Sequence, residues 1–193
     1  MLESPAPRVA FLGGSFDPPH VAHVLLAAYV LAIGEADEVL VVPVFEHAFG
    51  KHLAPYEQRV KMCELAFADI GHVKVSRVEQ QLPPPNRTLL TLQHLQAERP
   101  GAKFRLVIGS DVLADTPKWH AFHEVTRLAP LLVVPRTGHP HPGATVLPDV
   151  SSSQVRELLA RGDDVARARL AELVPRAVLD YVLETGLYRQ GRF

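Results

Sequence analysis

The sequence is short of cysteine, of excess charge and of long apolar runs, and each shortage excludes a class of protein. Cys63 is the single cysteine among 193 residues, so no intramolecular disulfide forms, which fits a reducing compartment. A net charge of −1 gives no electrostatic footprint for a nucleic acid polymer or an anionic membrane. No apolar run approaches a membrane span, and the first residues lack a signal-peptide pattern. We therefore expect a cytoplasmic protein that binds small molecules.

The glycine-rich turn near the N-terminus lacks a third glycine. Four apolar residues from Val9 suggest a strand buried on both faces, which breaks at Gly13 and Gly14. Glycines allow the backbone to approach a ligand that a side chain would block. The dinucleotide-binding fingerprint needs the third glycine and has small residues where this sequence has histidines, so a nicotinamide-dependent dehydrogenase is disfavoured.

Short apolar runs alternate with amphipathic stretches along most of the chain. This alternation predicts an α/β fold with a Rossmann-like, doubly wound parallel sheet of five or six strands. We expect a single domain over residues 1–193, with an α/β core over 8–150 and a C-terminal helical appendage over 151–193. The predicted strands are Val9–Leu12, Val39–Val42, Val73–Val75, Phe104–Ile108 and Leu131–Val134. The predicted helices are His20–Ile33, Pro55–Asp69, Thr88–Glu98, a short region around His120–Leu128, Ser152–Arg161 and Pro175–Glu184.

Two histidines follow the glycine turn. His20 and His23 are three residues apart, so they share one face of the predicted helix. In an open parallel sheet, ligands bind beyond the carboxyl ends of the strands, where this turn lies. A helix cap and a core side chain would be the plainer interpretation, but the pair directly after the turn favours phosphate handling. A metal pair is less favoured, because no third ligand stands at a recognisable spacing.

A serine-rich helix start forms a second candidate anion site. Ser151, Ser152 and Ser153 open a predicted helix, and Arg156 lies one turn inside it. Such serines cap free backbone N–H groups, and those groups with the helix dipole favour an anion. An ordinary N-cap followed by a surface arginine has the same pattern. The guanidinium fork of Arg156 can hold phosphate oxygens in bidentate fashion, which favours the anion site.

A third group of polar residues follows the fourth and fifth predicted strands. Gly109 and Asp111 end a buried strand, where an acid accepts from a ribose hydroxyl or caps the next helix. Trp119, the only tryptophan, lies among polar neighbours, which indicates partial exposure and allows stacking on a flat ring. Arg136 comes just after the fifth strand, so it either reaches a phosphate or lies on the surface.

Together these motifs resemble the nucleotidyltransferase superfamily with the His-x-Gly-His signature, and most closely the bacterial nicotinate-nucleotide adenylyltransferases. The segment Gly13–His20 followed by His23 is similar to the first motif of that family. Gly109–Asp111 with Trp119 resembles its nucleotide-recognition stretch, and Ser151–Arg156 resembles its Ser-Ser-Thr-x-x-Arg motif. The order and spacing of the three motifs agree from about residue 8 to the closing Gly-Leu-Tyr.

One residue and two segments depart from the family pattern. Ala22 replaces the signature glycine between the histidines and narrows the room for a phosphate. After the second strand the family carries Pro-Pro-His and a basic residue, whereas this chain has Pro43 and a run ending in Lys51, the candidate for the missing cation. Asn86–Thr88 replaces the Ser-Tyr-Thr that helps the family to recognise nicotinate.

The resemblance implies that a mononucleotide phosphate attacks the α-phosphorus of ATP, giving deamido-NAD and pyrophosphate, with Mg²⁺ bridging the phosphates and Asp17 as an outer contact. No metal-ligating residue is implied. The implied catalytic residues are His20, His23, Lys51 and Arg156. The implied ATP-binding residues are Gly13, Gly14, Ser15, Phe16, Asp111, Ser151, Ser152 and Ser153. The implied acceptor-binding residues are Asn86, Thr88, Trp119 and Arg136.

Three alternatives stay open on the sequence alone. A transferase of the same superfamily would use another acceptor, such as nicotinamide mononucleotide, phosphopantetheine or a phosphocholine-type substrate. A nucleotide-binding protein without turnover would account for Ala22 and the altered loop after the second strand. Metal-dependent hydrolysis through the histidines would require a tightly bound transition metal. The sequence also leaves open a homo-oligomer and closure of the Phe45–Ala54 loop over substrate.

Overall fold

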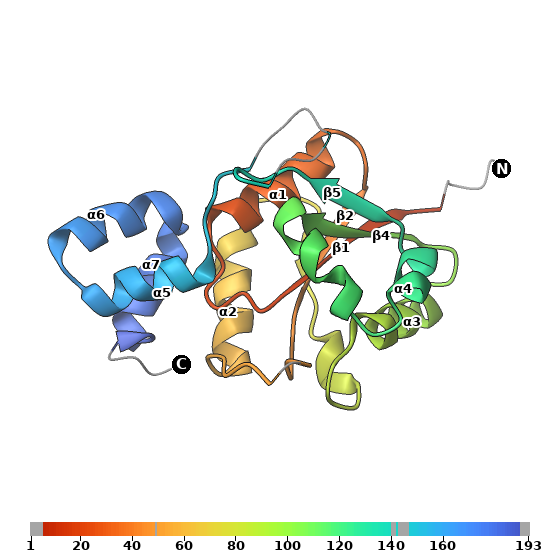
Figure 1. Ribbon diagram of the computed structural model, residues 1–193, viewed down its shortest axis with the longest axis horizontal. Helices are drawn as coiled ribbons and strands as arrows, with labels where there is room; N and C mark the ends of the chain where they lie inside the picture. Colours follow the sequence, from red (N-terminus) through yellow and green to blue (C-terminus); the bar gives the residue numbers. More distant parts are fainter. Residues whose placement is uncertain (1–5, 49, 140–141, 143–146, 190–193) are drawn as a thin grey trace.

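The computed structural model describes residues 6–48, 50–139, 142 and 147–189. Within these ranges, five parallel strands form one sheet in the order β3-β2-β1-β4-β5 (Figure 1). The strands are β1 (Arg8–Gly14), β2 (Glu38–Pro43), β3 (Val73–Val75), β4 (Lys103–Gly109) and β5 (Leu131–Val134). Each predicted strand is confirmed to within two residues at its ends. Residue 49 of the loop whose closure is an open question, and residues 190–193 of the predicted appendage, lie outside the described residues.

The predicted helices are confirmed, and further helical segments lie between them. The helices are α1 (Val21–Ala32), α2 (Tyr56–Phe67), α3 (Thr88–Glu98), α4 (Phe122–Leu128), α5 (Ser152–Arg161), α6 (Asp164–Leu173) and α7 (Arg176–Thr185). Two 3₁₀ segments, η1 (Val78–Gln81) and η2 (Ser110–Lys118), were not predicted. Among the described helices, none is long and apolar enough to cross a membrane.

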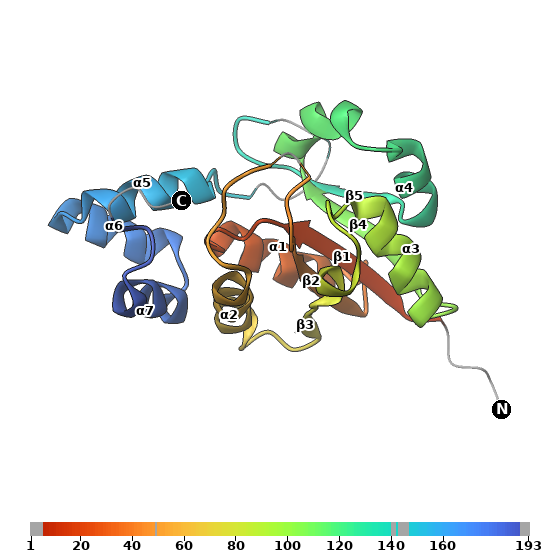
Figure 2. The same cartoon turned by 90° about the horizontal axis from the view of Figure 1, so that it is seen from below.

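The central strand β1 has both faces buried. Ala10 and Leu12 pack with apolar side chains of α1 and α2, whereas Val9 and Phe11 pack with those of α3 and α4. This alternation follows from the two-residue period of a strand. Figure 2 shows the two helical layers on opposite sides of the sheet. A continuous apolar run is therefore the expected pattern for this strand.

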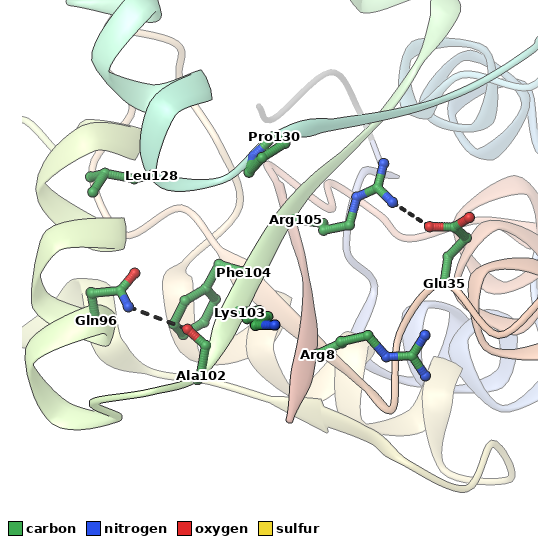
Figure 3. Close-up of a pocket in the computed structure, with 9 residues that line it drawn as sticks. All are labelled: Arg8, Glu35, Gln96, Ala102, Lys103, Phe104, Arg105, Leu128 and Pro130. Atoms are coloured by element: carbon green, nitrogen blue, oxygen red, sulfur yellow. Dashed lines mark hydrogen bonds and ion pairs between the residues drawn. The ribbon is translucent and has the colours of Figure 1, made fainter. Parts of the chain in front are cut away.

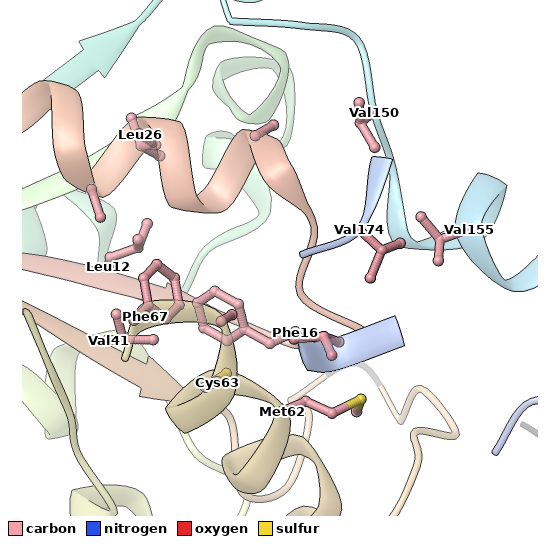
Figure 4. Close-up of a cluster of buried hydrophobic side chains, with 14 of the residues drawn as sticks. Leu12, Phe16, Leu26, Val41, Met62, Cys63, Phe67, Val150, Val155 and Val174 are labelled. Carbon is pink, nitrogen blue, oxygen red and sulfur yellow. The ribbon is translucent and has the colours of Figure 1, made fainter. Parts of the chain in front are cut away.

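The C-terminal helices α5, α6 and α7 form a group beside α2 (Figure 1). Helix α7 contacts α2, and α6 contacts α1. The side chains of Val155 and Val174 belong to the same buried cluster as Phe16 and Met62 (Figure 4). The C-terminal segment is thus packed against the part of the molecule that contains the loop after β1.

The strand order reverses at β1. The chain passes from β1 through β2 to β3 on one side, and then continues with β4 and β5 on the other side of β1. At such a reversal the loops after the two adjacent strands leave in opposite directions and open a crevice at the carboxyl ends of the strands. The fold therefore places the glycine turn at the usual ligand-binding edge of a doubly wound sheet.

Candidate active site

A cavity of about 790 Å³ opens at the carboxyl ends of β1 and β4. Its volume lies within the range of pockets that bind ligands of drug or cofactor size. Most of the predicted site residues line it: Gly13, Gly14, Ser15, His20, His23, Lys51, Asn86, Thr88, Asp111, Trp119 and Arg136. Folding therefore brings the glycine–histidine motif together with Asn86, Thr88 and the residues that follow β4, which are far apart in the sequence.

A second hollow of about 540 Å³ lies at the amino ends of β1 and β4 (Figure 3). Its arginines are already paired, Arg105 with Glu35 and Arg8 with Asp37. Parallel sheets bind ligands at the carboxyl ends of their strands, so the larger cavity is the candidate active site.

The two histidines stack at the start of α1. Their ring centroids lie 3.8 Å apart, and the rings are inclined by 26°. The backbone N–H of His20 donates to Nδ1 of His23 at 3.2 Å, so a neutral His23 carries its proton on Nε2. The ring of Phe16 packs against that of His23, with centroids 4.9 Å apart. His23 thus has a supported orientation and keeps one donor for a ligand.

Both histidines are neutral at neutral pH when no ligand is bound. Burial, and secondarily the charge of Arg136, lowers the pKa of His20 to about 3. Burial, His20 and Arg136 lower the pKa of His23 well below its usual value. Nδ1 of His20 is buried without a hydrogen-bond partner among the described residues. A phosphate would raise both pKa values, because a nearby negative charge favours the imidazolium form.

The glycine turn is closely packed on its protein side. A Cβ atom on Gly13 would lie 2.8 Å from Cε1 of Phe11, and one on Gly14 would lie 3.2 Å from the ring of Phe16. Both glycines also line the cavity. Packing beneath the turn and ligand approach above it therefore require the same small residues.

Arg136 and Asp111 form an ion pair beyond the ends of β4 and β5. Nη1 of Arg136 lies 2.6 Å from Oδ2 of Asp111, and its Nη2 donates to the carbonyl of Val150. Oδ1 of Asp111 and Nε of Arg136 have no hydrogen-bond partner within the described part of the chain. Both side chains line the cavity, while these two unpartnered atoms are themselves buried.

A buried network holds the segment after β2. Oδ1 of Asn86 accepts from the N–H of Glu46 at 2.8 Å, and Nδ2 donates to the carbonyl of Glu79 at 2.9 Å. The Glu79 carboxylate accepts from the N–H of Phe45 and the hydroxyl of Thr91, both at 3.0 Å. Burial raises the pKa of Glu79. Asn86 lines the cavity as predicted, but its amide is already used within the protein.

Other polar residues of the cavity were missed from the sequence. They are His47, Glu79, Arg87, Asp115, Lys118 and His120. Arg87 lies within the Asn86–Thr88 motif, and Lys118 and His120 flank Trp119, so their neighbours in the sequence were the available signal. Trp119 itself is half-buried, which agrees with the predicted partial exposure.

The serine motif packs against the loop after β1 and does not line the cavity. Ser151 caps α5 by accepting from the N–H of Gln154 at 3.2 Å. The hydroxyl of Ser152 donates to the carbonyl of Pro18 at 2.9 Å. The predicted contacts of Ser151, Ser152 and Ser153 with ATP therefore stay predictions.

Arg156 and Phe16 also lie beside the cavity rather than in its lining. Nη1 of Arg156 donates to the carbonyl of Asp17 at 2.6 Å, and Nη2 donates to the hydroxyl of Ser153 at 3.2 Å. Phe16 is buried, with its ring edge-on to that of Phe67. Their direct roles in the reaction stay predictions, while their contacts support the loop that precedes the histidines.

The donor set of the site suits a metal ion carried by phosphates rather than a protein metal cage. In the described ranges, no group of three or more His, Cys, Asp or Glu side chains could hold a metal ion. Asp111 and Asp115 line the cavity, but they pair with Arg136 and Lys118. Asp17 is buried and lies outside the lining. Mg²⁺ usually keeps several waters and binds to substrate phosphates with few protein ligands, which this arrangement permits.

The family to which the chain is similar agrees with this geometry. A family model described as cytidylyltransferase-like matches residues 11–158. This range contains the end of β1, the other four strands, the residues that line the cavity and the start of α5. The chain is therefore a nucleotidyltransferase.

Curated relatives define its family more narrowly. A protein of Anaeromyxobacter dehalogenans named "Probable nicotinate-nucleotide adenylyltransferase" is 48% identical over 186 residues, which cover 94% of this chain and 97% of that protein. A protein of the same name from Myxococcus xanthus is 43% identical over 95% of this chain and 96% of its own length. The chain belongs to the nicotinate-nucleotide adenylyltransferase family.

Solved structures support the fold. Nicotinic acid mononucleotide adenylyltransferase of Plasmodium falciparum, complexed with NaAD, superposes with a TM-score of 0.80 at 18% identity, covering 94% of this chain and 97% of that chain. The same protein complexed with APC gives a TM-score of 0.76 at 17% identity and the same coverage. The predicted Rossmann-like, doubly wound architecture is confirmed.

Proposed function

We propose that the protein transfers the adenylyl group of ATP to nicotinate mononucleotide, giving deamido-NAD and pyrophosphate in NAD biosynthesis. The observation that carries the proposal is the stacked, neutral pair of His20 and His23 at the start of α1, inside the cavity. The 48% identity to a relative that bears the corresponding name supports the choice of acceptor.

In this reaction a phosphate oxygen of the acceptor forms a bond to the α-phosphorus, and the bond from that phosphorus to the oxygen bridging to the β-phosphate breaks. The electron pair of the broken bond leaves with pyrophosphate. Such a transfer depends on in-line positioning and on stabilising charge, and it needs no protein nucleophile. His23 would donate through Nε2, and His20 would donate from the adjacent ring. The free N–H groups at the start of α1 would add to this anion site.

Other donors would bind the β- and γ-phosphates of ATP, which leave as pyrophosphate. Lys51 lines the cavity, which supports a role in neutralising the departing pyrophosphate. Ser151, Ser152, Ser153 and Arg156 lie next to the loop after β1, and we assign them to the β- and γ-phosphates when ATP occupies the cavity. Gly13, Gly14 and Ser15 would bring the backbone close to the nucleotide, with Asp111 accepting from a hydroxyl of its sugar.

The acceptor would occupy the part of the cavity near Trp119 and the start of α3. The ring of Trp119 is supported edge-on by Phe122, with centroids 6.0 Å apart. A half-buried indole with such support can stack on a pyridine ring. Thr88 and Asn86 line the adjoining wall, and Arg136 lies within the same cavity. We assign these residues to the mononucleotide.

Magnesium bound with the ATP phosphates would neutralise part of their charge and fix their geometry. The protein's contribution is then the placement of donors around those phosphates. We place the reaction in the cytoplasm, since a single cysteine fits a reducing compartment.

The function is tested by measuring magnesium-dependent pyrophosphate release from ATP. Nicotinate mononucleotide, nicotinamide mononucleotide and phosphopantetheine are supplied separately, and each product is identified by mass. We expect rapid release with nicotinate mononucleotide and a product with the mass of deamido-NAD. Faster release with another acceptor would overturn the proposed substrate. ATP binding without release with any of the three would overturn the proposed reaction.

A further inference from the structure

Polar contacts from distant segments converge on the loop between β1 and α1. None of the side chains that supply them lines the cavity. Carbonyl or carboxylate groups of residues 15–18 accept these bonds from α2, from residue 54, from α5 and from the residues that follow α7. The loop directly precedes His20, so its position determines where the histidine pair stands.

Arg59 of α2 joins two of these segments. It is 1% exposed, and it donates through Nε to the carbonyl of Ala54 and through Nη1 to the carbonyl of Ser15, both at 2.9 Å. Burial lowers the pKa of Arg59, while the charge of Asp17 opposes that shift. A buried arginine with two carbonyl partners and a nearby carboxylate fixes the position of the backbone segments that it joins.

Asp17 is the centre of the contacts. It is also 1% exposed, and its Oδ1 accepts from the N–H of Ala54 at 3.2 Å and from the hydroxyl of Tyr188 at 2.6 Å. Oδ2 has no hydrogen-bond partner in the described ranges and lies 3.7 Å from Nη1 of Arg156. Since a buried carboxylate depends on the few donors that reach it, the Tyr188 hydroxyl carries a large share of its stabilisation.

Tyr188 reaches Asp17 from beyond the end of α7. Its side chain is 3% exposed and packs in the same buried cluster as Phe16. Its φ of 65° is a left-handed conformation, which is uncommon for a bulky residue. Burial and Asp17 raise the pKa of Tyr188, so its hydroxyl stays protonated and donates.

We propose that Tyr188 is a positioning residue for nucleotide binding, acting through Asp17 on the loop that orients His20 and His23. Few contacts separate Tyr188 from the histidines. The Tyr188 hydroxyl donates to Asp17, which is adjacent to Phe16. Phe16 has a left-handed φ of 47°, and its ring packs against that of His23. This inference rests on the proposed function only in taking the histidine pair as the site that binds ATP phosphates.

The test compares two tyrosine-to-phenylalanine variants of the full chain. Tyr188→Phe removes the donor to Asp17 and keeps the ring. Tyr181→Phe removes a hydroxyl from α7 that makes no hydrogen bond with the described residues, and its ring packs on the edge of the same cluster. ATP affinity is measured by calorimetry without acceptor, and the KM of nicotinate mononucleotide is measured separately.

We expect Tyr188→Phe to raise the Kd of ATP about five- to tenfold, as loss of one hydrogen bond to a charged group can do. The KM of nicotinate mononucleotide and the Kd of ATP for Tyr181→Phe should stay within about twofold. An unchanged Kd of ATP in folded Tyr188→Phe overturns the proposal, even if its melting temperature falls. Because binding is read without acceptor, failure to turn over nicotinate mononucleotide would contradict the proposed function alone.

A second variant keeps the proposal testable if Tyr188→Phe does not fold. Asp17→Asn retains an acceptor for both donors but removes the charge that strengthens their bonds. We expect a rise of about two- to fivefold in the Kd of ATP, and no change would overturn the proposal. If both single variants fold, Tyr188→Phe should have a smaller effect in the Asp17→Asn background. Strictly additive effects on log Kd would also overturn it, because coupled residues in contact are non-additive.

Discussion

The side of the cavity that we propose for the phosphates is held by residues from far along the chain, whereas the side that we propose for the acceptor is held by a more local network. The loop after β1 is tied to Arg156 and Tyr188, which are 139 and 171 residues away from Asp17. On the acceptor side, Asn86 bonds to groups 7 and 40 residues away. The first arrangement depends on the packing of the whole domain, and the second on one loop, one 3₁₀ segment and one helix start.

This difference parallels the sequence patterns of the two sides. The phosphate side contains the motif from Gly13 to His23, which changes its expected pattern only at Ala22. The acceptor side contains Asn86–Thr88, which departs further, since two of the three residues of the family's Ser-Tyr-Thr are replaced. A local network can be altered without disturbing the sheet, so a change of acceptor is structurally easier than a change of phosphate handling.

The largest expected effect comes from removing a donor on the phosphate side. His23→Ala should lower kcat about 10²–10³-fold, the typical loss for one preorganised donor to a charged transition state. The fold should survive, as judged by circular dichroism and melting. His123→Ala, which removes an exposed histidine from α4 outside the cavity, is the matched control. Near-normal turnover by folded His23→Ala would remove this histidine from the mechanism.

Lys51 lies in the loop after β2 that departs from the family pattern, and we propose that it neutralises the departing pyrophosphate. Lys51→Ala should lower kcat about 10- to 100-fold, because a charged donor to the leaving pyrophosphate is lost. Lys61→Ala, in an exposed position on α2, should have no effect and serves as the control. Equal rates for the two variants would show that another cation serves the departing side.

Trp119 tests the acceptor side alone. Trp119→Ala should raise the KM of nicotinate mononucleotide about tenfold, since one aromatic stack on a base contributes roughly 1–3 kcal/mol. The Kd of ATP should change less than twofold, and Trp119→Phe should retain most of the affinity because it keeps a ring. A loss of ATP affinity with unchanged acceptor KM would reverse the assignment of the two sides.

The smallest expected effect is a dependence of stability on pH. The pKa of His20 is lowered to about 3, so the unfolded chain binds a proton below pH 6.5 that the folded protein does not. The free energy of unfolding should fall by about 1 kcal/mol for this histidine between pH 6.5 and 5.5, measured by urea unfolding. His20→Asn should show a shallower slope, and saturating ATP should reduce the slope of the wild type. Equal slopes for wild type and variant would show that His20 titrates normally.

The sequence predicted those strands and helices whose apolar period is visible within the segment itself. Strands such as Val39–Val42 are short apolar runs between turns, and their period is readable without tertiary information. The N-terminus of α6 carries a sequence signal, because Asp163 caps the helix directly after Gly162. The apolar pattern of α6 is irregular, so its range was not predicted. The 3₁₀ segment η2 contains Pro117, a residue that is disfavoured inside a helix, and it was not predicted.

The sequence by itself determined the strands, the glycine turn and the placement of His20 and His23 on one helical face. These features follow from backbone geometry and from neighbours a few residues away. Only the tertiary structure decided that the histidines are neutral, that the Asn86 amide is used inside the protein and that Tyr188 meets Asp17. Those properties depend on which distant segments meet and on how much water their meeting excludes, and no local pattern contains that information.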